Sequence, residues 1–228
     1  MSGHAYAAAV RPKSTAVDSR RSGPGGPLAV AVGCVLALVL VWVFAALVPG
    51  IHYRDAVALH DFSRLDSETL DSVANRLIHL LEPLLFTLWG VAIVAVGLAR
   101  SRPRHALAAA GVMAMAPLSA EILKPLLAHP HASVGWTYLG PASWPSGHAT
   151  AALALALSAT FVAPARLRWL VAGVGVVFSA ALGFALLIRA SHMPSDVLGG
   201  YLLATFWAAV ALAALRASER RWPAPQPS

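Results

Sequence analysis

Six long apolar blocks, separated by shorter polar stretches, most constrain what this chain can fold into. They run over residues 28–48, 78–98, 106–127, 149–165, 169–188 and 197–215. Each comes close to the roughly 20 apolar residues that a helix needs to cross a bilayer. With 58% hydrophobic and 12% charged residues, the composition also argues against a soluble globular domain. We therefore predict an all-α integral membrane bundle of six transmembrane helices.

Basic residues flank these blocks unevenly, which predicts the topology. Twelve of the 17 lysines and arginines lie in the N-terminal stretch or after the second, fourth and sixth blocks, and five lie on the opposite side. Because cytoplasmic loops are enriched in such residues, we expect a multi-pass protein of the cell membrane with both termini in the cytoplasm. The net charge of +7 then reflects topology, and no nucleic-acid partner is expected.

The chain divides into three predicted parts. Residues 1–27 are polar and basic and end in a run of glycines and prolines, which indicates a disordered cytoplasmic tail. Residues 28–216 are expected to form the six-helix domain, and residues 217–228 a cytoplasmic C-terminal tail. Residues 50–77 mix acidic and spaced apolar side chains, which indicates an amphipathic helix that lies on the membrane surface or caps the bundle.

Three polar stretches reach the extracytoplasmic side of this topology. The first contains Glu121 and Lys124, near the end of the third block. The second is Trp-Pro-Ser-Gly-His at residues 144–148, which opens the fourth block. The third, residues 189–196, joins the fifth block to the sixth. Ionisable groups within membrane spans are costly, so they point to a functional site.

The second stretch suits the binding of an anion. Pro145 fixes the start of the turn, and Ser146 can cap the following helix. Gly147 would let an anion approach the backbone N–H groups at the positive end of the helix dipole. His148, in the first helical turn, would then lie beside the anion and could donate a proton to a leaving oxygen.

The third stretch suits nucleophilic chemistry. Asp196 lies four residues after His192, and an aspartate that accepts a hydrogen bond from one imidazole nitrogen leaves the other nitrogen free to attack. Lys124 and Arg189 would add fixed positive charge for phosphate oxygens, the work that metal ions do in other phosphotransferases. We find no dedicated metal ligands in the sequence and expect neither a metal nor a cofactor.

The order of a lysine, Pro-Ser-Gly-His and His-x3-Asp resembles the type 2 phosphatidic acid phosphatase (PAP2) family, which includes bacterial lipid phosphate and polyprenyl-diphosphate phosphatases. The resemblance covers residues 121–215 by motif and the remaining helices by topology. It implies a metal-independent lipid phosphate phosphatase with its site on the extracytoplasmic face. The candidate substrates are phosphatidic acid, phosphatidylglycerol phosphate and polyprenyl diphosphates such as undecaprenyl diphosphate.

The resemblance also implies a role for individual residues. His192 would be the nucleophile that forms a phosphohistidine, Asp196 would orient it, and His148 would be the general acid. The phosphate would be bound by residues from all three stretches, namely Lys124, Ser146, Gly147, Arg189 and His131.

Two positions depart from the family motifs. The Arg-Pro expected after the lysine is His131-Ala132, and the Ser-Arg expected before the second histidine is Ala185-Leu186. We expect Arg189, three residues later, and His131 to stand in for the arginines, although imidazole is charged only part of the time near neutral pH. The alternatives are that Arg189 is an interfacial anchor and His131 an ordinary loop histidine.

Two other functions stay open on the sequence alone. The missing arginines favour a catalytically decayed lipid-binding protein on the same frame. Glu82, Glu121 and Lys124 are the only support for a small transporter or channel, and Glu121 with Lys124 can equally form a structural i, i+3 ion pair.

Overall fold

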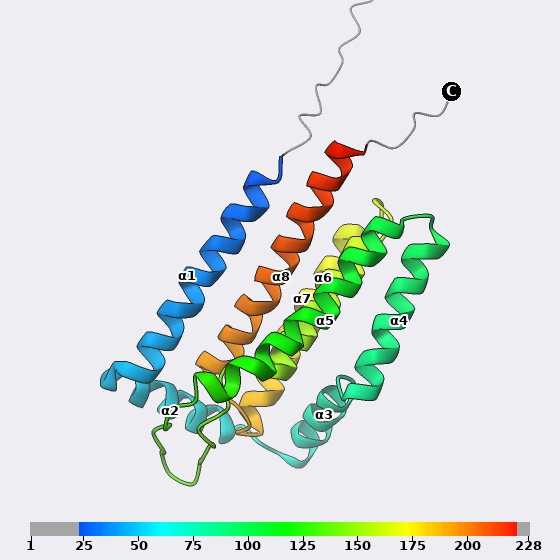
Figure 1. The fold of residues 1–228 in the computed structure, drawn as a ribbon. Helices are drawn as coiled ribbons and strands as arrows, with labels where there is room; N and C mark the ends of the chain where they lie inside the picture. The colour runs from blue at the N-terminus through cyan, green and yellow to red at the C-terminus, as the bar shows by residue number, and fades with distance from the viewer. Residues whose placement is uncertain (1–22, 223–228) are drawn as a thin grey trace, which may run out of the picture.

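The computed structural model describes residues 23–222, which form eight helices (Figure 1). These are α1 (Gly25–Leu47), α2 (Pro49–Ser63), α3 (Glu68–His79), α4 (Pro83–Ala99), α5 (Pro103–Leu126), α6 (Gly147–Val162), α7 (Arg168–Ile188) and α8 (Pro194–Arg221). Across residues 23–222 the only extended pairing is an isolated bridge between Val134 and Thr137. The all-α expectation is confirmed.

The helices follow the apolar blocks, with one interruption in the second block. There α3 ends at His79 and Pro83 begins α4, and the two helices are bent by 56°. Proline lacks an N–H and is favoured in the first turn of a helix, so it marks a natural start for α4. Glu82 lies at this break and pairs with His79.

Two helices extend beyond the blocks that predicted them. Helix α1 begins at Gly25, inside the stretch predicted as a tail, and α8 continues through polar residues to Arg221. The amphipathic stretch 50–77 forms two helices, α2 and most of α3, where one was expected. The remaining parts of the predicted tails, residues 1–22 and 223–228, lie outside the described residues.

Several helices have the length and composition of membrane spans. Four qualify singly, namely α1, α5, α7 and α8, and α3 with α4 makes a fifth if the bent pair is one span. Helix α6 is apolar but has only 16 residues. These helices support a multi-pass membrane protein, and the count of six spans stays a prediction.

Small residues let the central helices approach closely. Helix α6 contacts α5, α7 and α8, and five of its buried residues are alanines. At Gly200 of α8, an added Cβ would lie 2.7 Å from the Ser146 carbonyl oxygen and 3.0 Å from the Thr150 nitrogen. The backbones of α6 and α8 therefore touch where α6 begins, as small residues permit in membrane bundles.

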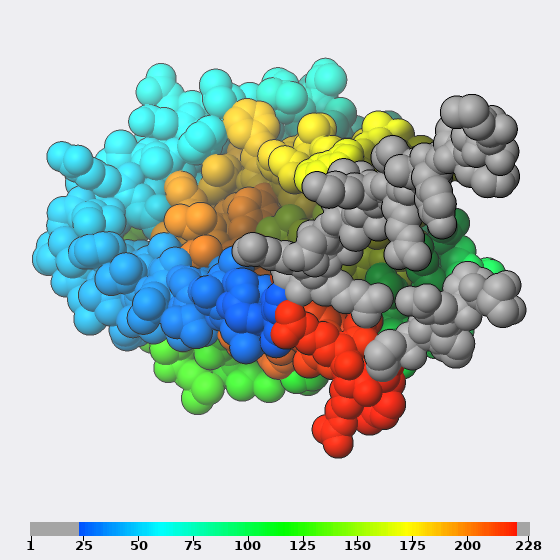
Figure 2. Space-filling view, turned by 90° about the horizontal axis from the view of Figure 1, so that it is seen from above, coloured from blue at the N-terminus to red at the C-terminus, as the bar shows by residue number. Residues whose placement is uncertain are grey.

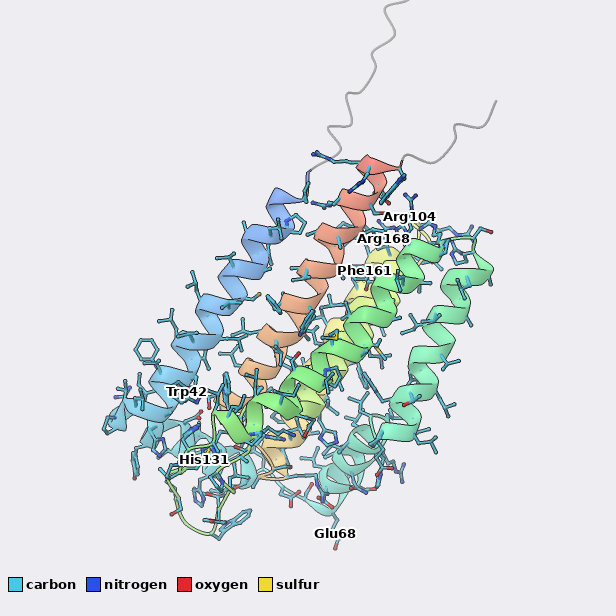
Figure 3. All side chains as sticks on the ribbon, in the orientation of Figure 1. Trp42, Glu68, Arg104, His131, Phe161 and Arg168 are labelled. Atoms are coloured by element: carbon cyan, nitrogen blue, oxygen red, sulfur yellow. The ribbon has the colours of Figure 1, made fainter. Side chains whose placement is uncertain are left out.

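The two ends of the bundle differ in their charged residues. Arg104 and Arg168 lie at the end that carries both ends of the described chain, and His131 lies at the opposite end (Figure 3). Arg216 Nη1 donates to the Gly23 carbonyl oxygen at 3.4 Å, and the start of α1 and the end of α8 lie side by side (Figure 2). Helices α2 and α3 lie across the other end (Figure 1).

The contact between α6 and α7 gives a test of this fold. A Cβ at Gly175 would lie 2.6 Å from the Ala156 Cβ, whereas at Gly173 of the same helix it would meet nothing within 4 Å. We expect Gly175→Ala to destabilise the protein by about 1–3 kcal/mol through overpacking. Gly173→Ala should be neutral or stabilise it by about 0.5–1 kcal/mol, since alanine favours the helix.

Thermal unfolding of both variants in detergent measures the difference. Equal stabilisation by the two substitutions would contradict the close crossing of α6 and α7.

Candidate active site

A buried carboxylate at the start of α8 holds the predicted nucleophile. Asp196 is 0% exposed, and its Oδ2 accepts the Met193 N–H at 3.0 Å and lies 3.2 Å from His192 Nδ1. Because a carboxylate can only accept, this contact places the proton of a neutral His192 on Nδ1. The lone pair is then on Nε2, as the four-residue spacing predicts.

Ser146 joins this pair to the start of α6. Its Oγ accepts the Ala149 N–H at 3.3 Å, so it caps α6 as the sequence predicts. Its own backbone N–H donates to the Asp196 carbonyl oxygen at 3.0 Å. Gly147 and His148 are the first two residues of α6, and their N–H groups have no acceptor inside the helix. The helix start therefore has donors for an anion.

The lysine stretch reaches the same place from α5. A Cβ at Gly147 would lie 2.9 Å from Glu121 Oε1 and 3.3 Å from Lys124 Nζ, so the ends of both side chains lie against the start of α6. Lys124 Nζ donates to Glu121 Oε1 at 2.6 Å, which is the expected i, i+3 pair. His148 lies close enough to Lys124 and His192 to interact electrostatically with both. The structure thus brings the three stretches together.

His131 lies in the loop between α5 and α6, at the same end of the bundle (Figure 3). Its Nε2 is 2.8 Å from Ser143 Oγ. Its ring lies parallel to that of His52 on α2, with centroids 6.5 Å apart, and 4.6 Å from that of His129. Three histidines from two segments therefore border the site.

Burial controls the charge of His131. It lowers the pKa of His131 below the usual 6.5, and the neighbouring histidines, His192 among them, act in the same direction. The charge of Asp196 acts in the opposite direction. The shift leaves the imidazole neutral at pH 7, within electrostatic reach of Asp196 and His192.

Arg189, the other predicted substitute for a family arginine, is paired with an acidic residue. It lies at the end of α7, and its Nη1 donates to Asp71 Oδ1 on α3. A phosphate would therefore have to compete with Asp71 for this guanidinium. The catalytic and phosphate-binding roles of all these residues stay predictions.

Helix α2 brings two polar residues that the sequence analysis missed. Asp55 accepts hydrogen bonds from the backbone N–H and the hydroxyl of Ser195, and His52 stands beside His131. The sequence pattern could have indicated both residues, because His52 and Asp55 share a helical face with the buried Ala56 and Leu59. Polar groups on the inward face of an amphipathic helix indicate a partner inside the fold.

An apolar groove of about 590 Å³ begins beside the site and runs between α1, α5 and α8. Trp144 lines it, two residues before Ser146, and Leu123 and Leu127 line it next to Lys124. Further along, its walls include Val39 and Phe206. At this end the groove is thus lined by chain neighbours of the proposed site residues, which do not line it themselves.

Comparison with known proteins identifies the frame on which this site is built. The structure matches the crystal structure of the first transmembrane PAP2 type phosphatidylglycerolphosphate phosphatase, from Bacillus subtilis, with a TM-score of 0.72 and 17% sequence identity. The match covers 85% of this chain and 98% of the other. A search of curated proteins finds no significant match. The sequence profile of the PAP2 superfamily matches residues 76–220, which include all three stretches. The chain therefore belongs to the PAP2 superfamily.

Proposed function

We propose that this protein is a membrane phosphatase that hydrolyses the phosphate ester or anhydride of a lipid through a phosphohistidine intermediate. The observation that carries the proposal is the junction of α6 and α8. There the Asp196 carbonyl oxygen accepts the Ser146 N–H, and the Asp196 side chain holds His192. One phosphate at this junction would face both a nucleophile and a helix N-terminus.

In the first proposed step, His192 Nε2 attacks the phosphorus and the bond to the leaving oxygen breaks. His148 gives its proton to that oxygen, so the product is a lipid alcohol, or a lipid monophosphate if the substrate is a diphosphate. The N–H groups at the start of α6 and Lys124 stabilise the charge on the other phosphate oxygens.

In the second step, water attacks the phosphorus of the phosphohistidine and gives a proton to His148, which releases inorganic phosphate and restores His192. This route needs no metal. Among the described residues no group of three or more His, Cys, Asp or Glu side chains is arranged to hold one. Lys124, Ser146, Gly147, Arg189 and His131 are the proposed phosphate-binding set.

The groove beside Trp144 supports a lipid as the substrate. A hydrocarbon chain that lay along α1, α5 and α8 would leave its phosphate at the start of α6. The candidates are phosphatidic acid, phosphatidylglycerol phosphate and polyprenyl diphosphates. The basic end of the bundle lies opposite the site, which supports cytoplasmic termini and an extracytoplasmic active site in the cell membrane.

Substitution of the three central residues tests the reaction. We expect His192→Ala and His148→Ala to lower phosphate release by about 10²–10⁴-fold, because each removes a group used in phosphoryl or proton transfer. Asp196→Asn should lower it by a comparable factor, because Asp196 sets the tautomer and orientation of His192. The assay follows inorganic phosphate released from each candidate lipid by purified protein, in EDTA, since the route includes no metal.

His105→Ala is the matched control, because His105 lies near the start of α5, at the opposite end from the site. It should keep wild-type activity. Full phosphate release by His192→Ala would contradict the mechanism, and lipid binding without phosphate release by the wild type would favour the decayed lipid-binding protein.

Filling the groove tests the lipid-tail assignment. We expect Val39→Trp to raise KM about tenfold for a long-chain lipid phosphate and to leave KM for a dihexanoyl analogue unchanged, because only the long chain reaches Val39. Val91→Trp is the matched control, since Val91 is exposed to a similar extent and lines a separate groove between α4 and α5. Equal effects on both substrates would contradict the assignment.

The charge of His131 predicts a pH dependence of substrate binding. Because its pKa is lowered, the imidazole gains its proton, and hence its attraction for phosphate, only as the pH falls below about 6.5. An arginine is charged throughout this range. We expect His131→Arg to lower KM several-fold at pH 7.5, and the ratio of the two KM values to shrink as the pH is lowered below 6.5, measured by steady-state kinetics. A KM ratio that is constant across the whole pH range in which the enzyme is active would contradict a phosphate-binding role for His131.

A further inference from the structure

We propose that Asp55 of α2 is a positioning residue for this reaction, because it fixes the start of α8 and with it the His192–Asp196 pair. This inference rests on the proposed function. Helix α2 lies outside residues 76–220, which match the family profile, so the role belongs to the N-terminal part of this chain.

The contact joins Asp55 to the residue that directly precedes Asp196. Asp55 Oδ1 accepts the Ser195 N–H at 3.2 Å, and Oδ2 accepts the Ser195 hydroxyl at 2.5 Å. A carboxylate that accepts two donors from one residue restrains both the position and the orientation of that residue. Ser195 lies between His192 and Asp196 in the chain, so this restraint acts on both.

The first turn of α8 needs such a partner. Pro194 has no N–H, the Met193 N–H is accepted by the Asp196 side chain, and the Ser195 N–H is left for an acceptor outside the helix. Asp55 is that acceptor. Two carboxylates therefore cap α8 together, one from its own first turn and one from α2, at the end where the helix dipole favours negative charge.

Helix α2 is itself well anchored, so it can act as a fixed support. Ala56 and Leu59 are completely buried and form a cluster with Met193. His52 Nδ1 lies 2.7 Å from the Ala45 carbonyl oxygen of α1. Asp55 is thus held between an apolar contact and a contact with α1, on the helical face that meets α8.

The charge of Asp55 is costly at this place. Burial raises the pKa of its carboxyl, the hydrogen bonds from Ser195 lower it, and the nearby charges of Asp196 and His52 act in opposite directions. An apolar residue would fill the space without this cost. Unlike an apolar residue, a carboxylate accepts directed hydrogen bonds from Ser195, and these restrain the position of His192.

The test compares substitutions that remove or keep these hydrogen bonds, assayed with a short-chain lipid phosphate. Asp55→Leu has the same branched shape with a larger volume but accepts nothing, and we expect it to lower kcat about 10–100-fold with KM changed less than threefold, as misplacement of a catalytic group does. Asp55→Asn can accept the Ser195 N–H and donate to its hydroxyl, so kcat should stay within about threefold of wild type. Asp61→Leu, on the exposed side of α2, is the matched control and should match wild type.

Ser195→Ala removes the hydroxyl contact without changing α2, which keeps the test valid if Asp55→Leu fails to fold. We expect Ser195→Ala to lower kcat about three- to tenfold. The double variant of Asp55→Leu and Ser195→Ala should have a kcat no lower than that of Asp55→Leu alone, because the two residues act as one unit. The role would be overturned if Asp55→Leu and Ser195→Ala both kept wild-type kcat. It would also be overturned if Asp55→Asn lost as much kcat as Asp55→Leu. No phosphate release by the wild type would instead overturn the proposed function, and this role with it.

Discussion

The site depends on one buried carboxylate, that of Asp196. A buried charge is stable only with partners, and Asp196 has the Met193 N–H and the His192 ring on the same oxygen. Its backbone carbonyl also accepts the Ser146 N–H, which ties α8 to the cap of α6. Asp196 thus sets both the tautomer of His192 and the distance between the N-termini of α6 and α8. Any displacement of Asp196 would move the proposed nucleophile, His192, and the proposed anion-binding turn at the start of α6 relative to each other.

Close approach of the helices makes this junction possible. Gly200 lets the α8 backbone touch the start of α6, and Gly147 leaves room for the Lys124 and Glu121 side chains. The site consequently lies at helix ends, where backbone N–H groups are available, while the helices below it stay apolar and suited to a bilayer. Chain neighbours of the site residues, Trp144 and Leu123 among them, line the apolar groove between α1, α5 and α8. This arrangement fits a substrate whose phosphate is polar and whose tail is not.

Local spacing made much of the site predictable. Ser146 caps a helix three residues on, and Asp196 reaches His192 across one turn, because such contacts depend on short stretches of chain. Apolar block length likewise predicted where most helices lie. The contacts of Asp55 with Ser195 and of Asp71 with Arg189 were not predictable in this way, since each joins residues more than 100 positions apart. The break before Pro83 was missed because the apolar residues on its two sides were read as one block, residues 78–98, that includes Glu82 and Pro83.

The most direct test is a structure of the protein with bound vanadate, a phosphate analogue that can form a bond to a nucleophilic nitrogen. We expect vanadium bonded to His192 Nε2, with its oxygens contacting the Gly147 and His148 N–H groups and the Lys124 ammonium. Vanadate bound elsewhere, or the imidazoles of His148 and His192 facing different compartments, would contradict a single phosphate site at the junction of α5, α6 and α8.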